Sequence, residues 1–166
     1  REISEEVAHH LKELIDFSQQ QSVLVVGLGN QDITADSLGP RAVGNIHMTR
    51  HVIREYGLKS CSHMKMHQIS GIVPGVMAQT GMETLEIVQG VVAETKPDVV
   101  IAIDALAARS TARLNRTIQI TDTGISPGSG VGNHREGLNE ENLSVRVIGI
   151  GVPTVVDAAT IVHDSM

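Results

Sequence analysis

The chain has 166 residues, of which 41% are hydrophobic and 19% charged, and its formal net charge is −6. This length fits one ordinary domain, and the composition excludes an intrinsically disordered chain. The negative charge argues against a nucleic-acid-binding surface, because phosphate contacts need clustered lysine and arginine side chains. No apolar run approaches the ~18 residues that span a bilayer, so we expect no membrane segment.

The first half of the sequence predicts two helices and two strands. Apolar residues recur at helical spacing over residues 3–17. Residues 22–27 read Ser-Val-Leu-Val-Val-Gly, a short apolar run typical of a strand buried on both faces. A second helix is expected over residues 38–54, with Pro40 in its first turn. A strand is expected over residues 64–69.

The second half continues the alternation of helices and strands. The run Thr80-Gly81-Met82-Glu83 has the spacing of a capping box and predicts a helix over residues 80–95. The clearest strand covers residues 98–103. Further strands are expected over residues 116–121 and 145–152, and a last helix over residues 157–163. This order predicts a single α/β domain, residues 1–166, with a mostly parallel twisted sheet and helices on both faces.

A glycine-rich segment interrupts this alternation of helices and strands. Residues 124–137 read Gly-Ile-Ser-Pro-Gly-Ser-Gly-Val-Gly-Asn-His-Arg-Glu-Gly, which is too rich in glycine for a helix or a strand. It is either a mobile surface loop or a substrate-binding segment. In the second case residues 124–132 should border the functional site.

Two acidic residues are candidates for chemistry. Ligands of a doubly wound sheet bind outside the carboxyl ends of its strands. Asp104 directly follows the predicted strand at residues 98–103, and Asp36 lies in the loop after the first strand. Either residue could instead cap a helix, and Asp32 competes with Asp36 in the same loop. Two carboxyl groups that face each other can share one proton and activate water, and such a pair titrates as a unit.

Two glycine motifs resemble known signatures without matching them. Gly27-Leu28-Gly29 begins like a dinucleotide fingerprint, but Asp32 stands where the third glycine would be, so we expect no such cofactor. Gly128-Ser129-Gly130 lacks the spacing of a nucleophile elbow. A catalytic pair of Ser129 and His134 remains an alternative.

Histidine spacing raises the question of a metal site. His47 and His51 are four residues apart on a predicted helix, as in some zinc sites, and His63 and His67 have the same spacing. No glutamate follows His47 in the pattern of a metalloprotease helix. Solvated histidines explain both pairs, so we expect neither a metal nor another cofactor.

Several stretches of the chain together resemble the core of the germination proteases. They are Val25–Asn30, Asp36–Pro40, Pro74–Met77, Thr95–Asp98, Ala102–Ser110, Thr121–Ile125, Pro127–Asn133 and Ile150–Ala158. They occur in order and span most of the chain. Because the chain begins with Arg1 rather than methionine, we expect it to be the catalytic core of a longer protein.

The resemblance implies an atypical aspartic endopeptidase that degrades small acid-soluble spore proteins during germination. It also implies a zymogen, a homotetramer, a location in the cytoplasm of the spore core, and a fold similar to that of hydrogenase-maturation peptidases. Carried over by motif, the catalytic aspartates are Asp36 and Asp104. Asn30, Gly128, Ser129 and Gly130 are expected to contact the substrate.

Two other functions stay open at this point. The same two aspartates could ligate a cation in a metal-assisted peptidase of the maturation type, with His134 as a third ligand. Alternatively, the chain could be a non-enzymatic module that binds a peptide or an anion. The single Cys61 allows no internal disulfide and favours a reducing, cytoplasmic setting.

Overall fold

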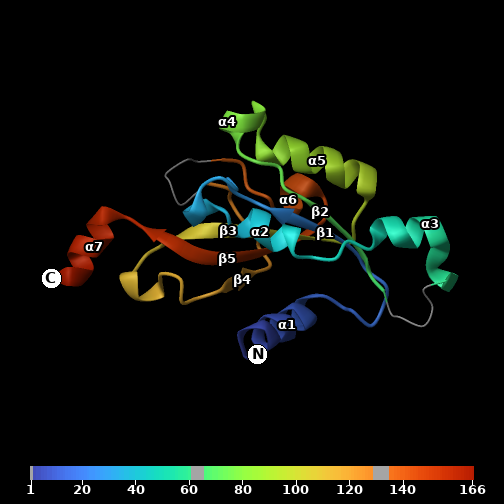
Figure 1. The fold of residues 1–166 in the computed structure, drawn as a ribbon, viewed down its shortest axis with the longest axis horizontal. Helices are drawn as coiled ribbons and strands as arrows, with labels where there is room; N and C mark the ends of the chain where they lie inside the picture. Colours follow the sequence, from blue (N-terminus) through green and yellow to red (C-terminus); the bar gives the residue numbers. More distant parts are fainter. Residues whose placement is uncertain (1, 61–65, 129–134) are drawn as a thin grey trace.

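The centre of the molecule is a five-stranded sheet with the strand order β2-β1-β3-β5-β4 (Figure 1). The computed structural model describes residues 2–60, 66–128 and 135–166. The strands are β1 (Ser22–Gly27), β2 (Gln68–Ile72), β3 (Val99–Ala108), β4 (Gln119–Thr121) and β5 (Arg146–Val156). β1 pairs in parallel with β2 and β3, and β3 pairs in parallel with β5. Only β4, at one edge, is antiparallel. The predicted α/β class and mostly parallel sheet are confirmed.

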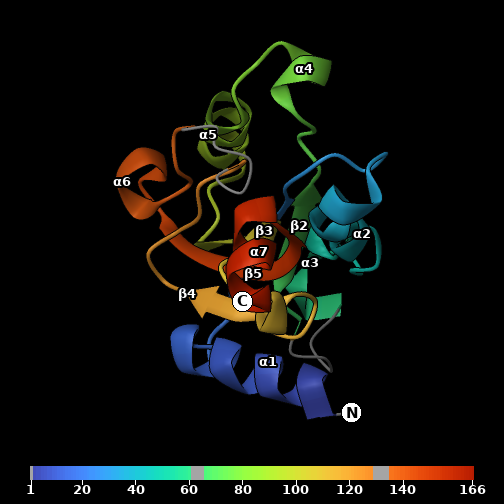
Figure 2. The same ribbon diagram turned by 90° about the vertical axis from the view of Figure 1, so that its left-hand side faces the viewer.

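Helices cover both faces of this sheet. They are α1 (Glu2–Leu14), α2 (Leu38–Gly44), α3 (Arg50–Ser60), α4 (Met77–Thr80), α5 (Thr84–Thr95), α6 (Glu140–Leu143) and α7 (Ala158–Ser165), with short 3₁₀ turns η1 (Thr34–Asp36) and η2 (Thr111–Arg113). Side chains of α1 and α2 join one core cluster, and side chains of α5 and α6 join the other. Figure 2 shows α1 and α5 on opposite sides of the strands.

The two core clusters follow from the alternation of side chains along each strand. In β1, Leu24 and Val26 belong to the cluster under α5, whereas Val23 and Val25 belong to the cluster over α1. All four are buried. A strand covered on both faces therefore needs a continuous aliphatic run, which is what made β1 predictable. Each such side chain stabilises the fold by roughly 1.5–3 kcal/mol through burial.

The helix predicted over residues 38–54 is wrong, because the chain forms two helices there. α2 ends at Gly44, and α3 begins at Arg50. Between them, the hydroxyl of Thr49 donates to the carbonyl of His67 and accepts from the N–H of Ile69. The N–H of Thr49 also donates to the carbonyl of Ile69. These bonds attach Thr49, in the connection between the two helices, to the start of β2.

The helix start predicted at Thr80 is also wrong. Thr80 is the last residue of α4, and Gly81 follows it in the left-handed conformation with φ of 71°. α5 begins at Thr84, and its first turn is closed by the carboxylate of Glu86, which accepts from the N–H of Glu83 at 2.8 Å. The capping pair is therefore Glu83 and Glu86, three residues beyond the predicted one.

Two strands are longer than predicted. β3 continues past residue 103 to Ala108, and β5 continues past residue 152 to Val156. The two strands pair along this extension, from Asp104 opposite Gly151 to Ala108 opposite Val156. In Figure 1 the extended β5 leads toward α7 at one end of the molecule. Asp104 thus lies inside β3 and not after it.

The strand order creates a switch point between β1 and β3. After β1 the chain crosses to β2 on one side, and it then returns to β3 on the other side. The carboxyl end of β1 consequently lies beside Ile103 of β3, and the connections of the two strands diverge, which is where α/β sheets bind ligands. Among the described residues, no helix is long and apolar enough to cross a membrane.

Candidate active site

Asp36 lies in the loop after β1, and local contacts shape this loop around it. Its carboxylate accepts a hydrogen bond of 2.7 Å from the backbone N–H of Asn30. Gly29 has φ of +112°, and a Cβ there would lie 2.1 Å from the carbonyl oxygen of Asp36 and 2.9 Å from its Oδ1. The tight loop therefore requires glycine at position 29, both for the backbone angle and for the close approach.

Asp104 projects from the neighbouring strand into the protein. It follows Val100 and Ala102 in the side-chain alternation of β3, so it lies on the face that α5 covers. Only 4% of its surface is exposed. Its carboxyl oxygen Oδ1 accepts a hydrogen bond of 2.9 Å from the backbone N–H of Ala105.

Burial and a neighbouring charge change the acidity of Asp104. Burial, and to a smaller extent the negative charge of Asp36, together raise the pKa of this carboxyl from 3.8 to about 7. The N–H of Ala105 opposes both effects weakly, because it favours the ionised form. At neutral pH a large fraction of Asp104 therefore keeps its proton. A buried acid that is half protonated near pH 7 is suited to donate a proton in catalysis.

Asp36 and Asp104 line one cavity of about 420 Å³, which lies beside the carboxyl end of β1 and the second half of β3. This size is within the range of small-molecule and peptide side-chain pockets. Most of its wall is apolar, including Leu28, Ile33, Val76, Met77, Leu106 and Val155. The remaining charged side chain that lines it among the described residues is Arg135. The cavity can therefore hold an uncharged chain segment against two carboxyl groups.

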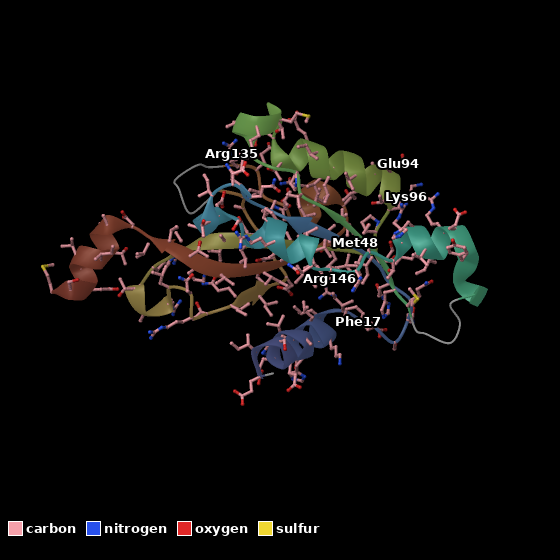
Figure 3. The ribbon with its side chains drawn as sticks, in the orientation of Figure 1. Phe17, Met48, Glu94, Lys96, Arg135 and Arg146 are labelled. Carbon is pink, nitrogen blue, oxygen red and sulfur yellow. The ribbon has the colours of Figure 1, made fainter. Side chains whose placement is uncertain are left out.

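Arg135 ties the end of the glycine-rich segment to the helical side of the cavity. Its Nη1 donates to Oε1 of Glu83 at 3.1 Å and to the sulfur of Met77 at 3.2 Å. Figure 3 shows Arg135 near α4. The same segment is anchored at its base, where Ile125 and Leu138 exchange two backbone hydrogen bonds.

The predicted substrate-contacting residues fall into three groups. Gly128 lines the cavity. Asn30 is not among the described residues that line it; its side-chain oxygen accepts from the N–H of Asp32 and from Gln79. Ser129 and Gly130, like His134, lie outside the described residues.

The competing candidates lie elsewhere. Asp32 is exposed and does not line the cavity. His47 precedes α3 in the connection after α2, so the placement of His47 and His51 on one helix is wrong. The Nδ1 of His67 accepts from the N–H of Gln21, and its ring packs edge-on against Phe17. Within the described part of the chain, no three His, Cys, Asp or Glu side chains gather where they could hold a metal ion.

Sequence reasoning missed Arg135 and Thr154, which also line the cavity. Arg135 is the one basic residue in the glycine-rich segment at residues 124–137, which was a usable signal. Thr154 carries no such signal, because it reaches the cavity through the pairing of β5 with β3. The fold and the site together define an α/β domain with two carboxyl groups in a pocket at the switch point, one of which has its pKa raised to about 7.

Comparisons with known proteins identify the family of the chain. A family model described as germination protease matches residues 1–166. The chain is 50% identical over 165 residues to a germination protease of Clostridium perfringens (strain SM101 / Type A), which covers 99% of this chain and 50% of that protein. It is 52% identical over 155 residues to a germination protease of Bacillus subtilis (strain 168), with 93% and 41% covered. The chain belongs to the germination protease family.

The chain spans about half the length of the curated relatives it matches. Among solved structures it is similar to a [NiFe] hydrogenase maturation protease from Thermococcus kodakarensis. The TM-score is 0.49 and the sequence identity is 19%, over 87% of this chain and 85% of that one.

Proposed function

We propose that this protein is an endopeptidase of spore germination in which Asp36 and Asp104 act as an acid–base pair. The observation that supports this most strongly is their position in one cavity, with Asp104 buried and its pKa raised to about 7. Membership of the germination protease family supports the peptidase activity. Small acid-soluble spore proteins are the proposed substrates, as the family resemblance implies.

Each carboxyl group has a separate role in the proposed reaction. Ionised Asp36 takes a proton from a water molecule, whose oxygen then bonds to the carbonyl carbon of the substrate. Protonated Asp104 donates its proton to the nitrogen of the scissile bond, which breaks as the amine leaves. One water is consumed and the proton passes from Asp36 back to Asp104 between turnovers. Catalysis of this kind contributes on the order of 10² to 10⁴ in rate.

The activity test compares three matched substitutions in the protein as its organism makes it. Asp36→Asn and Asp104→Asn keep the side-chain volume but cannot exchange the proton. Each should abolish cleavage of a purified small acid-soluble spore protein while the circular dichroism spectrum stays unchanged. Asp32→Asn is the control, because Asp32 is exposed and outside the cavity. Equal losses in all three variants would contradict the assignment.

Chelation separates this mechanism from a metal-assisted one. An acid–base pair should keep its activity after treatment with a strong chelator. Activity that is lost on chelation and restored by zinc or manganese would make the aspartates cation ligands. A protein that binds spore proteins without cleaving them would support the non-enzymatic binding module.

The family resemblance also leads us to propose an assembly and a location. We expect a homotetramer in the cytoplasm of the spore core, made first as a zymogen. Light scattering coupled to size-exclusion chromatography measures the assembly directly. A monomer at micromolar concentration would contradict this proposal and leave the roles of Asp36 and Asp104 unaffected.

A further inference from the structure

β5 contains an irregularity next to the cavity. Its pairing with β3 runs from Leu106 opposite Pro153 to Ala107 opposite Val155, so Thr154 is an extra residue without a partner in the register. Such a bulge turns the side chain of the extra residue away from the regular alternation. Pro153, which has no N–H to donate, directly precedes it, and proline within sheets is found at bulges. The bulge therefore sets the direction of the Thr154 side chain.

The Thr154 side chain reaches the loop that carries Asp36. Its hydroxyl donates a hydrogen bond of 2.5 Å to the carbonyl oxygen of Ala35, the residue before Asp36. The two residues are 119 positions apart in the sequence, and both line the cavity. Thr154 is half-buried, so water competes with this bond only in part.

The other bonds around Asp36 are local. The N–H of Asn30 donates to the carboxylate of Asp36, and the N–H of Asp36 donates to the carbonyl of Ile33. These contacts shape the loop but do not attach it to the sheet. Among the hydrogen bonds of the described residues, the bond from Thr154 is the one that joins residues 34–36 to a strand.

We propose that Thr154 is a positioning residue that fixes Asp36 opposite Asp104 by binding the carbonyl of Ala35. The proposal rests on the function proposed above, since it explains how one member of the pair is held. The bulge is then part of the site, because it directs the side chain of Thr154 in β5 toward the η1 turn.

The position of Asp36 has a measurable effect on Asp104. The charge of Asp36 is one of the two causes that raise the pKa of Asp104, and exclusion of water is the other. A loosened η1 turn would move this charge away and admit water. Both changes lower the pKa of Asp104, so this pKa reports the position of Asp36. The other charged side chain that lines the cavity among the described residues is Arg135. It belongs to a different segment and bonds to Glu83, not to Thr154.

The variants separate the hydroxyl from the shape of the side chain. Thr154→Val keeps the shape and removes the donor, whereas Thr154→Ser keeps the donor. Thr154→Ala removes the donor without added bulk and serves if the valine variant does not fold. Thr95→Val is the matched control, because the Thr95 hydroxyl donates to the carbonyl of Val91 within α5 and does not line the cavity.

The readout is the titration of Asp104 in the protein as its organism makes it, followed by NMR of ¹³C-labelled aspartate carboxyls. The resonance is assigned by its disappearance in Asp104→Asn. We expect Thr154→Val to lower the pKa of Asp104 by at least about half a pH unit. Thr154→Ser and Thr95→Val should titrate like the wild type. A titration that is unchanged in both Thr154→Val and Thr154→Ala overturns the proposal.

Cleavage kinetics give the second readout and keep the two proposals distinguishable. A misplaced Asp36 should reduce kcat on the order of 10-fold to 100-fold with KM changed less than about twofold. Thr154→Ser should restore kcat. If the wild type cleaves nothing, the proposed function fails, but the shift of the Asp104 titration still decides the role of Thr154.

Discussion

Replacing Asp104 by asparagine should change how the stability of the protein depends on pH. Asp104 has a pKa of about 7 in the folded protein, against an ordinary value of 3.8. Each pH unit between these values corresponds to 1.36 kcal/mol. Ionisation of Asp104 above pH 7 therefore destabilises the folded protein by about 4 kcal/mol, relative to a carboxyl with the same pKa in both states.

The sign follows from where the proton is bound. Between about pH 4 and pH 7 the folded protein keeps the proton on Asp104, while the unfolded chain has released it. The contribution of Asp104 to stability is therefore full below about pH 4, falls as the pH rises, and is lost above about pH 7. Asparagine stays neutral at every pH, so the variant lacks this loss. Its amide oxygen can still accept from the N–H of Ala105.

Urea unfolding of the wild type and of Asp104→Asn, at several pH values from 4.5 to 8, measures this effect. The free energy of unfolding of the variant, minus that of the wild type, should rise by about 3 to 4 kcal/mol over this range. The exposed control Asp32→Asn should follow the wild type. A difference between Asp104→Asn and the wild type that does not vary with pH would refute the raised pKa.

Two further predictions follow from the loop around Asp36. Asp36→Asn should lower the pKa of Asp104, because it removes the neighbouring negative charge; an unchanged titration in carboxyl NMR would show that burial acts alone. Gly29→Ala should lower the free energy of unfolding by more than about 1 kcal/mol, since its φ is +112° and its Cβ would meet Asp36. Gly44→Ala, where a Cβ meets nothing within 4 Å, should be neutral or stabilising in the same urea titration. Equal effects at the two glycines would contradict this account.

The elements that could be predicted from the sequence are those whose side chains are buried in the apolar core. β1 and the first part of β3 are buried on both faces, so their apolar runs were unambiguous. The predictions failed where tertiary contacts decide. Asp104 and the four residues after it were predicted to follow the strand, but pairing with β5 extends β3 through them. The helical pattern of residues 38–54 is interrupted between α2 and α3, where the side chain of Thr49 bonds to the backbone of His67 and Ile69.

The candidate site was predictable to a similar extent. Asp36 and Asp104 were proposed from their positions near strand ends, and they do line one cavity. The order of strands, in which β1 and β3 are neighbours, places them together. Thr154 was not predictable, because its contact with Ala35 depends on a one-residue bulge between β3 and β5. Pattern reading along one chain does not locate such a bulge.

The pH dependence of kcat/KM for cleavage of a small acid-soluble spore protein tests the central claim most directly. The acid–base pair requires a protonated Asp104, whose pKa is about 7. We predict that kcat/KM falls above about pH 7 and that a second inflection at lower pH completes the titration of the pair. A rate that keeps rising from pH 7 to pH 9 would contradict the role of Asp104 as the proton donor.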